Sequence, residues 1–150
     1  MQKGVLAGYP VVNLAANLFD GSYHDVDSNE ISFKLAAAIA YREGLPKANP
    51  VILEPVGMLK VYIPENYVGD VMGDLNKRRG RVMGIEPAHD DNGTQIVLAE
   101  APFAEMTDYV ISLRAMTQGR GKFDFDFIRY DEVPASLTDK IIAEAKQNAN

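Results

Sequence analysis

The 150-residue sequence predicts an α+β protein made of a short strand-and-helix segment, a βαββαβ domain and a short C-terminal helix. Three observations carry this prediction. Hydrophobic residues make up 47% of the chain and charged residues 24%, which is ordinary globular composition. Apolar residues recur at helical spacing in some segments and alternate with polar residues in others. Glycine, proline and asparagine punctuate these segments, and their order repeats in two similar halves.

Residues 1–48 predict a strand followed by a helix. Val11–Phe19 is rich in apolar residues and ends at a turn-like sequence, as strands do. Asp27 and Glu30 stand three positions apart, which is the spacing of an N-terminal capping box. Pro46 ends the helix, and a linker follows. The apolar residues at helical period between them are Ile31, Leu35, Ala38 and Ile39.

Residues 49–134 predict a second domain with two similar halves. In each half a strand leads into a helix that carries an apolar stripe, and the Asn92-Gly93 pair predicts a turn between the halves. This order in about 80 residues is that of the ferredoxin-like fold, an antiparallel sheet with both helices on one face. The expected strands are Val51–Ile63, Arg81–Glu86, Thr94–Ala101 and Lys122–Tyr130, and the expected helices begin at Pro64 and after Pro102.

Three finer expectations concern the ends of these elements. Gly80 is expected to close the first helix of the domain as a C-terminal cap glycine. Phe123, Phe125 and Phe127 alternate with polar or smaller residues, so this stripe is expected to lie in the core. Residues 135–150 are expected to form a short helical tail, with Ser136 as its cap.

The composition excludes several classes of function. The chain has no cysteine, which removes disulfides, thiolate zinc sites and cysteine nucleophiles. Its two histidines, His24 and His89, are too few for a multi-histidine metal centre. No apolar run approaches the roughly 20 residues that cross a bilayer, and the first residues lack a signal-peptide core. We therefore expect a cytoplasmic protein with no membrane partner.

The charge is acidic overall and locally basic. The net charge is −6, yet four of the five positions from Lys77 to Arg81 are basic. Cations at the end of a helix stabilise its dipole, which explains one or two of them. Contact with phosphate groups is the alternative explanation for the rest. A phosphate-cradling loop at Gly119–Lys122 is excluded, because the spacing of that motif is absent.

The loop Gly21–Asp27 holds the richest cluster of polar side chains. Four interpretations remain open for it: a metal site on His24, Asp25 and Asp27, an acid–base pair of His24 and Asp25, a surface tip that contacts another molecule, and a plain turn with a helix cap. The metal site is the weakest, because the loop offers few ligands. A histidine on such a turn is suited to hydrogen bonding and stacking with nucleotide bases.

Several long motifs in fixed order closely resemble the C-terminal part of bacterial elongation factor G. The resemblance runs from about residue 4 to residue 134. The segments that carry it are Leu6-Ala7-Gly8-Tyr9-Pro10-Val11-Val12, Gly21-Ser22-Tyr23-His24-Asp25-Val26-Asp27-Ser28, Gly69-Asp70-Val71-Met72-Gly73-Asp74-Leu75-Asn76-Lys77-Arg78-Arg79-Gly80 and Met116-Thr117-Gln118-Gly119-Arg120-Gly121.

The resemblance implies a fragment of a five-domain translational GTPase that moves transfer RNA and messenger RNA through the ribosome. Residues 1–48 would be the end of domain IV, which has the fold of the second domain of ribosomal protein S5, and residues 49–134 would be the ferredoxin-like domain V. GTP and magnesium would bind upstream in the full-length parent. This fragment itself is then expected to have no cofactor, no metal and no catalytic residue. Met1 is expected to be an engineered start.

The resemblance also implies a role for the polar loop. In the family this loop is the tip of domain IV and enters the decoding centre, where its histidine approaches the codon and anticodon. His24 would make that contact, and Ser22, Tyr23 and Asp25 would shape the tip. Domain V of the family touches ribosomal RNA; from their charge, we assign that contact to Arg78, Arg79, Arg81 and Arg120 as a hypothesis.

Two departures from the family pattern keep other functions open. Glu54–Lys60 is one residue longer than the usual motif, and Tyr62 and Tyr67 replace more polar residues. A ribosomal protection protein of the tetracycline-resistance type, or a ribosome-recycling paralogue, is therefore an alternative. A ferredoxin-like module that binds a small regulatory molecule is an alternative of another class. An incomplete domain IV sheet would expose an apolar face, which predicts self-association of the fragment.

Overall fold

The computed structural model describes residues 3–88 and 93–148. The chain divides into two compact units, one formed by residues 53–132 and the other by residues 1–52 together with 133–150. Of the predicted Asn92-Gly93 turn, Asn92 lies outside the described residues, and Gly93 has a positive φ of 67°.

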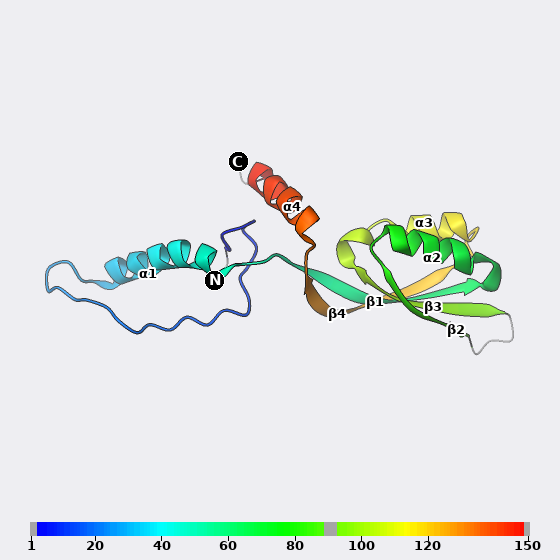
Figure 1. Cartoon of the computed structure of the whole chain (residues 1–150), viewed down its shortest axis with the longest axis horizontal. Coiled ribbons are helices and arrows are strands. Elements are labelled where there is room, and N and C mark those ends of the chain that lie inside the picture. Colours follow the sequence, from blue (N-terminus) through cyan, green and yellow to red (C-terminus); the bar gives the residue numbers. More distant parts are fainter. Residues whose placement is uncertain (1–2, 89–92, 149–150) are drawn as a thin grey trace. The chain divides into compact units, whose positions relative to one another are not determined.

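The unit of residues 53–132 has the predicted βαββαβ order and is a ferredoxin-like domain (Figure 1). Its four strands form one antiparallel sheet in the order β2-β3-β1-β4, and both helices lie on the same face of that sheet. The elements are β1 (Leu53–Pro64), α2 (Val68–Lys77), β2 (Arg81–Pro87), β3 (Thr94–Pro102), α3 (Tyr109–Met116) and β4 (Lys122–Glu132).

The core of this domain lies between the sheet and the two helices. Alternate residues of the central strands point to the helices, as the period of two requires. Each large aliphatic side chain buried there contributes about 1.5–3 kcal/mol relative to an exposed one. The fully buried members are Leu59, Val61 and Ile63 of β1, Val97, Ala99 and Ala101 of β3, Val71 and Leu75 of α2, and Tyr109 of α3; Leu113 of α3 is almost fully buried.

The phenylalanine stripe of β4 is only partly in the core. Phe123 and Phe125 pack against it, whereas Phe127 is 52% exposed. The expectation was therefore wrong for Phe127. In α3, Val110 is exposed, and the neighbouring Tyr109 takes the buried position.

The end of α2 differs from the expected glycine cap. Arg79, and not Gly80, has the left-handed backbone conformation, with a φ of 60°. Gly80 is needed for a different reason: its N–H donates to the Leu75 carbonyl at 2.7 Å, and a Cβ at position 80 would lie 2.8 Å from that oxygen. The close approach of two backbone segments therefore excludes a side chain there.

The other unit contains α1 (Glu30–Gly44), a 3₁₀ turn Leu45–Ala48 and α4 (Ala135–Asn148). The predicted helix that carries Ile31, Leu35, Ala38 and Ile39 is confirmed as α1. The predicted strand Val11–Phe19 is wrong, because that segment is irregular. A strand needs a partner for its ladder, and no strand pairs with this segment among the described residues. No helix of the described chain is long and apolar enough to cross a membrane.

The N-terminal caps of these two helices differ from the expected ones. Asn29 caps α1: its Oδ1 accepts from the Ser32 N–H at 2.9 Å, and the Ser32 hydroxyl accepts from the Asn29 N–H at 2.9 Å. The capping box is therefore Asn29 and Ser32, two residues beyond the expected pair. Helix α4 begins at Ala135, so Ser136 lies inside its first turn.

Candidate nucleic-acid interface

The loop before α1 is a tight turn held by two backbone hydrogen bonds and one to the side chain of Ser28. The His24 carbonyl accepts from the Asp27 N–H at 3.3 Å and from the Ser28 N–H at 3.0 Å. The His24 N–H donates to the Ser28 hydroxyl at 2.8 Å. These three bonds fix the backbone of residues 24–28, and the Asn29 cap follows at once. The loop conformation is therefore set locally, by short-range bonds.

The side chains of the predicted tip residues point to solvent. Ser22, Tyr23, His24 and Asp25 are all exposed, and Tyr23 is 64% exposed. Within the part of the chain that the structure describes, none of these four side chains has a hydrogen-bond or ion-pair partner. The turn therefore presents a hydroxyl, a phenol, an imidazole and a carboxylate together.

Two of the interpretations of this loop concern its local chemistry. No bond joins His24 to Asp25 in the described loop, so it shows no preformed acid–base pair. The described residues contain no group of three His, Asp or Glu side chains placed to hold a metal ion. An exposed imidazole and phenol can both stack on a base and hydrogen-bond to its edges. Ser28, which holds the turn, was missed as a site residue.

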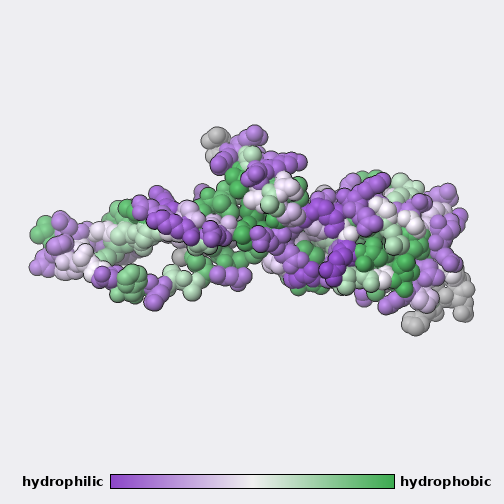
Figure 2. All heavy atoms as spheres, in the orientation of Figure 1, coloured by the Kyte–Doolittle hydropathy of each residue, from purple (hydrophilic) through white to green (hydrophobic). Residues whose placement is uncertain are grey.

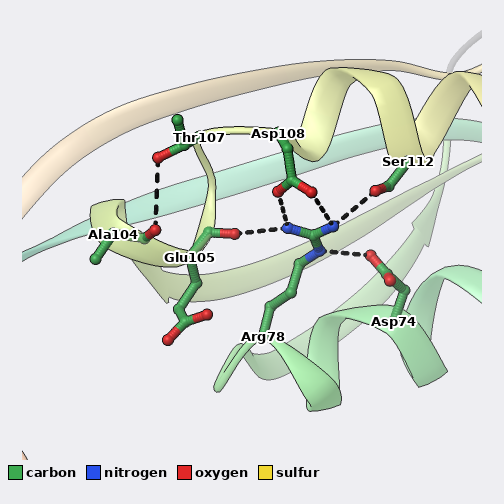
Figure 3. A network of polar contacts seen from close by, with 7 residues as sticks. All are labelled: Asp74, Arg78, Ala104, Glu105, Thr107, Asp108 and Ser112. Carbon is green, nitrogen blue, oxygen red and sulfur yellow. Dashed lines mark hydrogen bonds and ion pairs between the residues drawn. The ribbon is translucent and has the colours of Figure 1, made fainter. Parts of the chain in front are cut away.

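The fold divides the predicted RNA-contacting arginines into two sets, Arg78 with Arg79 and Arg81 with Arg120. Arg78 uses all of its N–H donors inside the domain (Figure 3). Its Nε donates to Asp74 at 2.8 Å, its Nη1 to Asp108 at 2.6 Å and to the Glu105 carbonyl at 2.7 Å, and its Nη2 to the Ser112 hydroxyl at 2.7 Å and to Asp108 at 3.5 Å. The guanidinium thus ties the end of α2 to the start of α3.

Arg78 is largely buried, and its bonds change the pKa values of the groups around it. The Arg78 side chain is only 14% exposed, and its guanidinium lies 5.4 Å from the centre of the Tyr109 ring. The hydrogen bonds from Arg78 hold the pKa of Asp108 below its ordinary range, and the same bonds raise the pKa of Arg78. Burial raises the pKa of the Tyr109 phenol above its ordinary value. Arg78 therefore stays charged as an internal link.

Arg79 is also paired inside the domain. Its guanidinium forms an ion pair with Glu54, a residue that is 9% exposed, and lies 3.6 Å from the Glu105 carboxylate. The hydrogen bond to Glu54 raises the pKa of Arg79. Because Glu54 is buried, the ion pair leaves no uncompensated charge at the start of β1.

Arg81 and Arg120 are placed differently. Both are exposed, and neither has an ion-pair partner among residues 3–88 and 93–148. Arg81 makes only a weak 3.4 Å contact with the sulfur of Met83. The structure does not bring the four predicted arginines together as one surface. Contact of the four arginines with RNA stays a prediction. Arg81 and Arg120 have free donors for such a contact.

Comparison with known proteins identifies both parts of the chain. Residues 51–141 match the family model described as the elongation factor G C-terminus, and residues 1–49 match the model of elongation factor G domain IV. A crystal structure of a protein from Thermus thermophilus is similar, with a TM-score of 0.81 and 42% sequence identity. That similarity covers 97% of this chain and 22% of the other, so this chain spans about a fifth of its relative.

The two matches follow one another along the chain without overlap, in the same order as the sequence motifs that carry the resemblance. The ferredoxin-like unit of residues 53–132 falls wholly inside the C-terminal match. Two models that together cover most of the sequence, and a solved relative at 42% identity, establish the kinship. The chain therefore belongs to the elongation factor G family.

Proposed function

We propose that this chain is the ribosome-contacting C-terminal part of a translational GTPase that promotes the movement of transfer RNA and messenger RNA during elongation. The observation that carries the proposal is the succession of an elongation factor G domain IV and C-terminus along one chain. GTP and magnesium would then act in the longer protein that contains this chain, outside these 150 residues. The role of the chain is contact, with no reaction of its own.

The exposed loop is the proposed contact with the decoding centre. His24 and Tyr23 present rings that can stack on bases, and Ser22 and Asp25 add a donor and an acceptor. The bonds between His24 and Ser28 hold the turn before any partner arrives. A preformed loop loses little conformational entropy when it binds, which favours a precise contact.

His24→Ala in the full-length protein tests this assignment. We expect the rate of translocation to fall by roughly tenfold, because one stacked or hydrogen-bonded contact to a base contributes about 1–3 kcal/mol. Ribosome-stimulated GTP hydrolysis should remain close to that of the unmodified protein. Rapid-mixing kinetics of messenger RNA movement and phosphate release measure the two steps separately.

Glu43→Ala is the matched control, because Glu43 is exposed at the other end of α1. It should change neither rate. An equal loss of translocation and hydrolysis in His24→Ala would reject the tip assignment. A protein that splits ribosomes with a recycling factor but does not support translocation would instead be the recycling paralogue.

The phosphate contacts are proposed for Arg81 and Arg120, whose donors are free. Replacing both by glutamine should weaken ribosome binding and reduce its dependence on salt, by roughly 0.7–0.9 in the logarithmic slope for each lost phosphate contact. Arg42→Gln, an exposed cation of α1, is the control. Binding measured by filtration at several salt concentrations gives the slope. An unchanged slope would remove both arginines from the interface.

A further inference from the structure

An exposed step of aromatic rings is formed by Phe127 and Tyr130 of β4 together with Phe103, which follows β3. The ring centres of Phe103 and Phe127 lie 6.5 Å apart, and those of Phe127 and Tyr130 lie 5.1 Å apart. The three residues are 37%, 52% and 61% exposed, in the order given. Phe103 is anchored to the partly buried Phe125, with 4.4 Å between ring centres. The aromatic step is therefore packed against a neighbouring ring at Phe103 and exposed to solvent at Tyr130.

The fold explains why these rings are not covered. Helix α3 has only eight residues, and Tyr109 at its start packs edge-on against Phe123 at 5.1 Å. A bulge in the pairing of β1 with β4 inserts one residue between Phe127 and Arg129. Such a bulge re-aims the side chains that follow it, and here it leaves the ring of Tyr130 beside that of Phe127.

The same strand is an edge of the sheet. β4 pairs with β1 on one side, and no other strand of the described residues pairs with its free side. From Lys122 to Phe127 the register is regular, so the outward backbone groups of this stretch can accept another strand. This stretch and the aromatic step together are called the β4 edge below.

Acidic side chains line the opposite face of the β4 edge. Asp124 and Asp126 alternate with the phenylalanines and are exposed. Lys60 stands opposite Asp124 on β1, but neither aspartate forms an ion pair within the described ranges. Arg129, the nearest arginine on the strand, is already paired with Glu100 and Asp131. The β4 edge therefore offers negative charge and aromatic rings to a partner.

We propose that the β4 edge binds an extended, cationic segment of another protein by strand addition. Alternate side chains of an added strand point to opposite faces of the sheet. Basic residues of the segment would then meet Asp124 and Asp126, while the residues between them would contact the aromatic step. A lysine or arginine near the open end can also lie over the ring of Tyr130, which attracts cations.

The charges favour this occupant over two others. RNA would bring phosphates next to the carboxylates of Asp124 and Asp126, and these anions would repel one another. A second copy paired through β4 would bring the aspartates of both strands to one face, and like charges that stand opposite one another are destabilising. A basic protein segment is the partner that complements both faces of the strand. The proposal does not depend on the ribosomal role proposed above.

A peptide that alternates lysine and valine over roughly ten residues is the probe, with a glutamate–valine peptide as its counterpart. Fluorescence anisotropy of the dye-labelled peptides measures binding to the whole chain. We expect saturable binding of the lysine peptide only, weakening as salt rises. Asp124→Lys with Asp126→Lys should reduce the affinity about tenfold or more, because attraction becomes repulsion. Tyr130→Ala should reduce it about fivefold.

Two matched controls separate the β4 edge from general effects. Glu86→Lys reverses an exposed acid on β2, at the other edge of the sheet, and Ile111→Ala removes an exposed apolar side chain of α3. Both should leave the affinity unchanged. Amide hydrogen exchange should slow in residues 122–127 when the lysine peptide binds. If the double aspartate variant does not fold, Asp126→Asn and Tyr130→Ala carry the test.

Several outcomes would overturn the proposal. Equal binding of the two peptides, an affinity that survives reversal of both aspartates, or slowed exchange confined to other strands would each exclude this site. Displacement of the lysine peptide by an oligouridine of equal affinity would mean that the β4 edge binds RNA. A change in sedimentation caused by the aspartate reversals would mean that a second copy occupies the strand.

Discussion

Arg78 shows how far a single residue can be understood from its neighbours in sequence. Asp74 precedes it by four positions, the spacing at which opposite charges meet on a helix, so one of its bonds was predictable. Asp108 and Ser112 lie about thirty positions away and become partners only when α3 packs against α2. A cation that has no evident partner in the sequence can therefore have all of its donors hydrogen-bonded in the folded domain. The bonds of the tip loop, in contrast, join residues within the same turn.

Tyr109 carries a prediction at the same scale. Its side chain is fully buried, yet its hydroxyl has no hydrogen-bond partner among the residues that the structure describes. A buried polar group without a partner loses its bonds to water and gains nothing in return. Tyr109→Phe should therefore leave the free energy of unfolding unchanged or raise it by up to about 1 kcal/mol. Urea unfolding followed by circular dichroism measures the change.

Tyr109→Ala is the contrast for that variant. It should lower the free energy of unfolding by about 3–5 kcal/mol, because it removes a ring from the centre of the core and leaves a cavity. A loss of more than about 1 kcal/mol in Tyr109→Phe would mean that the hydroxyl does have a partner in solution, such as a bound water.

At the scale of elements, the sequence predicted the ferredoxin-like domain well and residues 1–29 poorly. The domain was predictable because each strand and helix has a clear period and a partner within the same chain segment. Val11–Phe19 has strand-like composition, but composition alone does not provide a neighbouring strand. Gly80 was expected to be required at the end of α2, but the sequence could not show the reason. The close approach to Leu75 exists only in the folded turn.

The sheet contains an ion pair whose contribution to stability depends on pH. Arg129 of β4 donates to both oxygens of Glu100 on β3, at 2.8 and 3.0 Å, and so joins two strands across β1. These hydrogen bonds hold the pKa of Glu100 below its ordinary value, and Arg78 does the same for Asp108. A carboxylate with a lowered native pKa stabilises the fold above its unfolded pKa, about 4 for these groups.

That stability is lost as the pH falls through the lowered native pKa, because protonation removes the charge that the arginine binds. We therefore expect the urea midpoint of the ferredoxin-like domain to be constant near neutral pH and to fall below about pH 4. In Arg129→Gln the midpoint should be lower at neutral pH, and it should fall less steeply in acid. An equally steep fall in this variant would show that Glu100 is not the group that titrates.

The whole molecule combines a well-packed domain with a thinly packed second unit. In the unit that contains α1, no residue of that helix is buried. Leu18, Phe19 and Val26 are each 92% exposed, and Ile31 and Leu35 of α1 are also exposed. Figure 2 shows apolar surface among the atoms of this part of the chain. Exposed apolar side chains of this number favour association with another protein surface.

This surface predicts that the 150-residue protein associates with itself as its concentration rises. Ile31→Lys with Leu35→Lys places two charges one turn apart on the exposed face of α1, so association should weaken by roughly tenfold or more. The unfolding of the ferredoxin-like domain should not change, because neither side chain belongs to its core. Ile111→Lys, on an equally exposed position of α3, should leave association as it was. Sedimentation equilibrium over a range of concentrations distinguishes the cases, and a strictly monomeric chain at the highest concentration would show that these side chains are covered in solution.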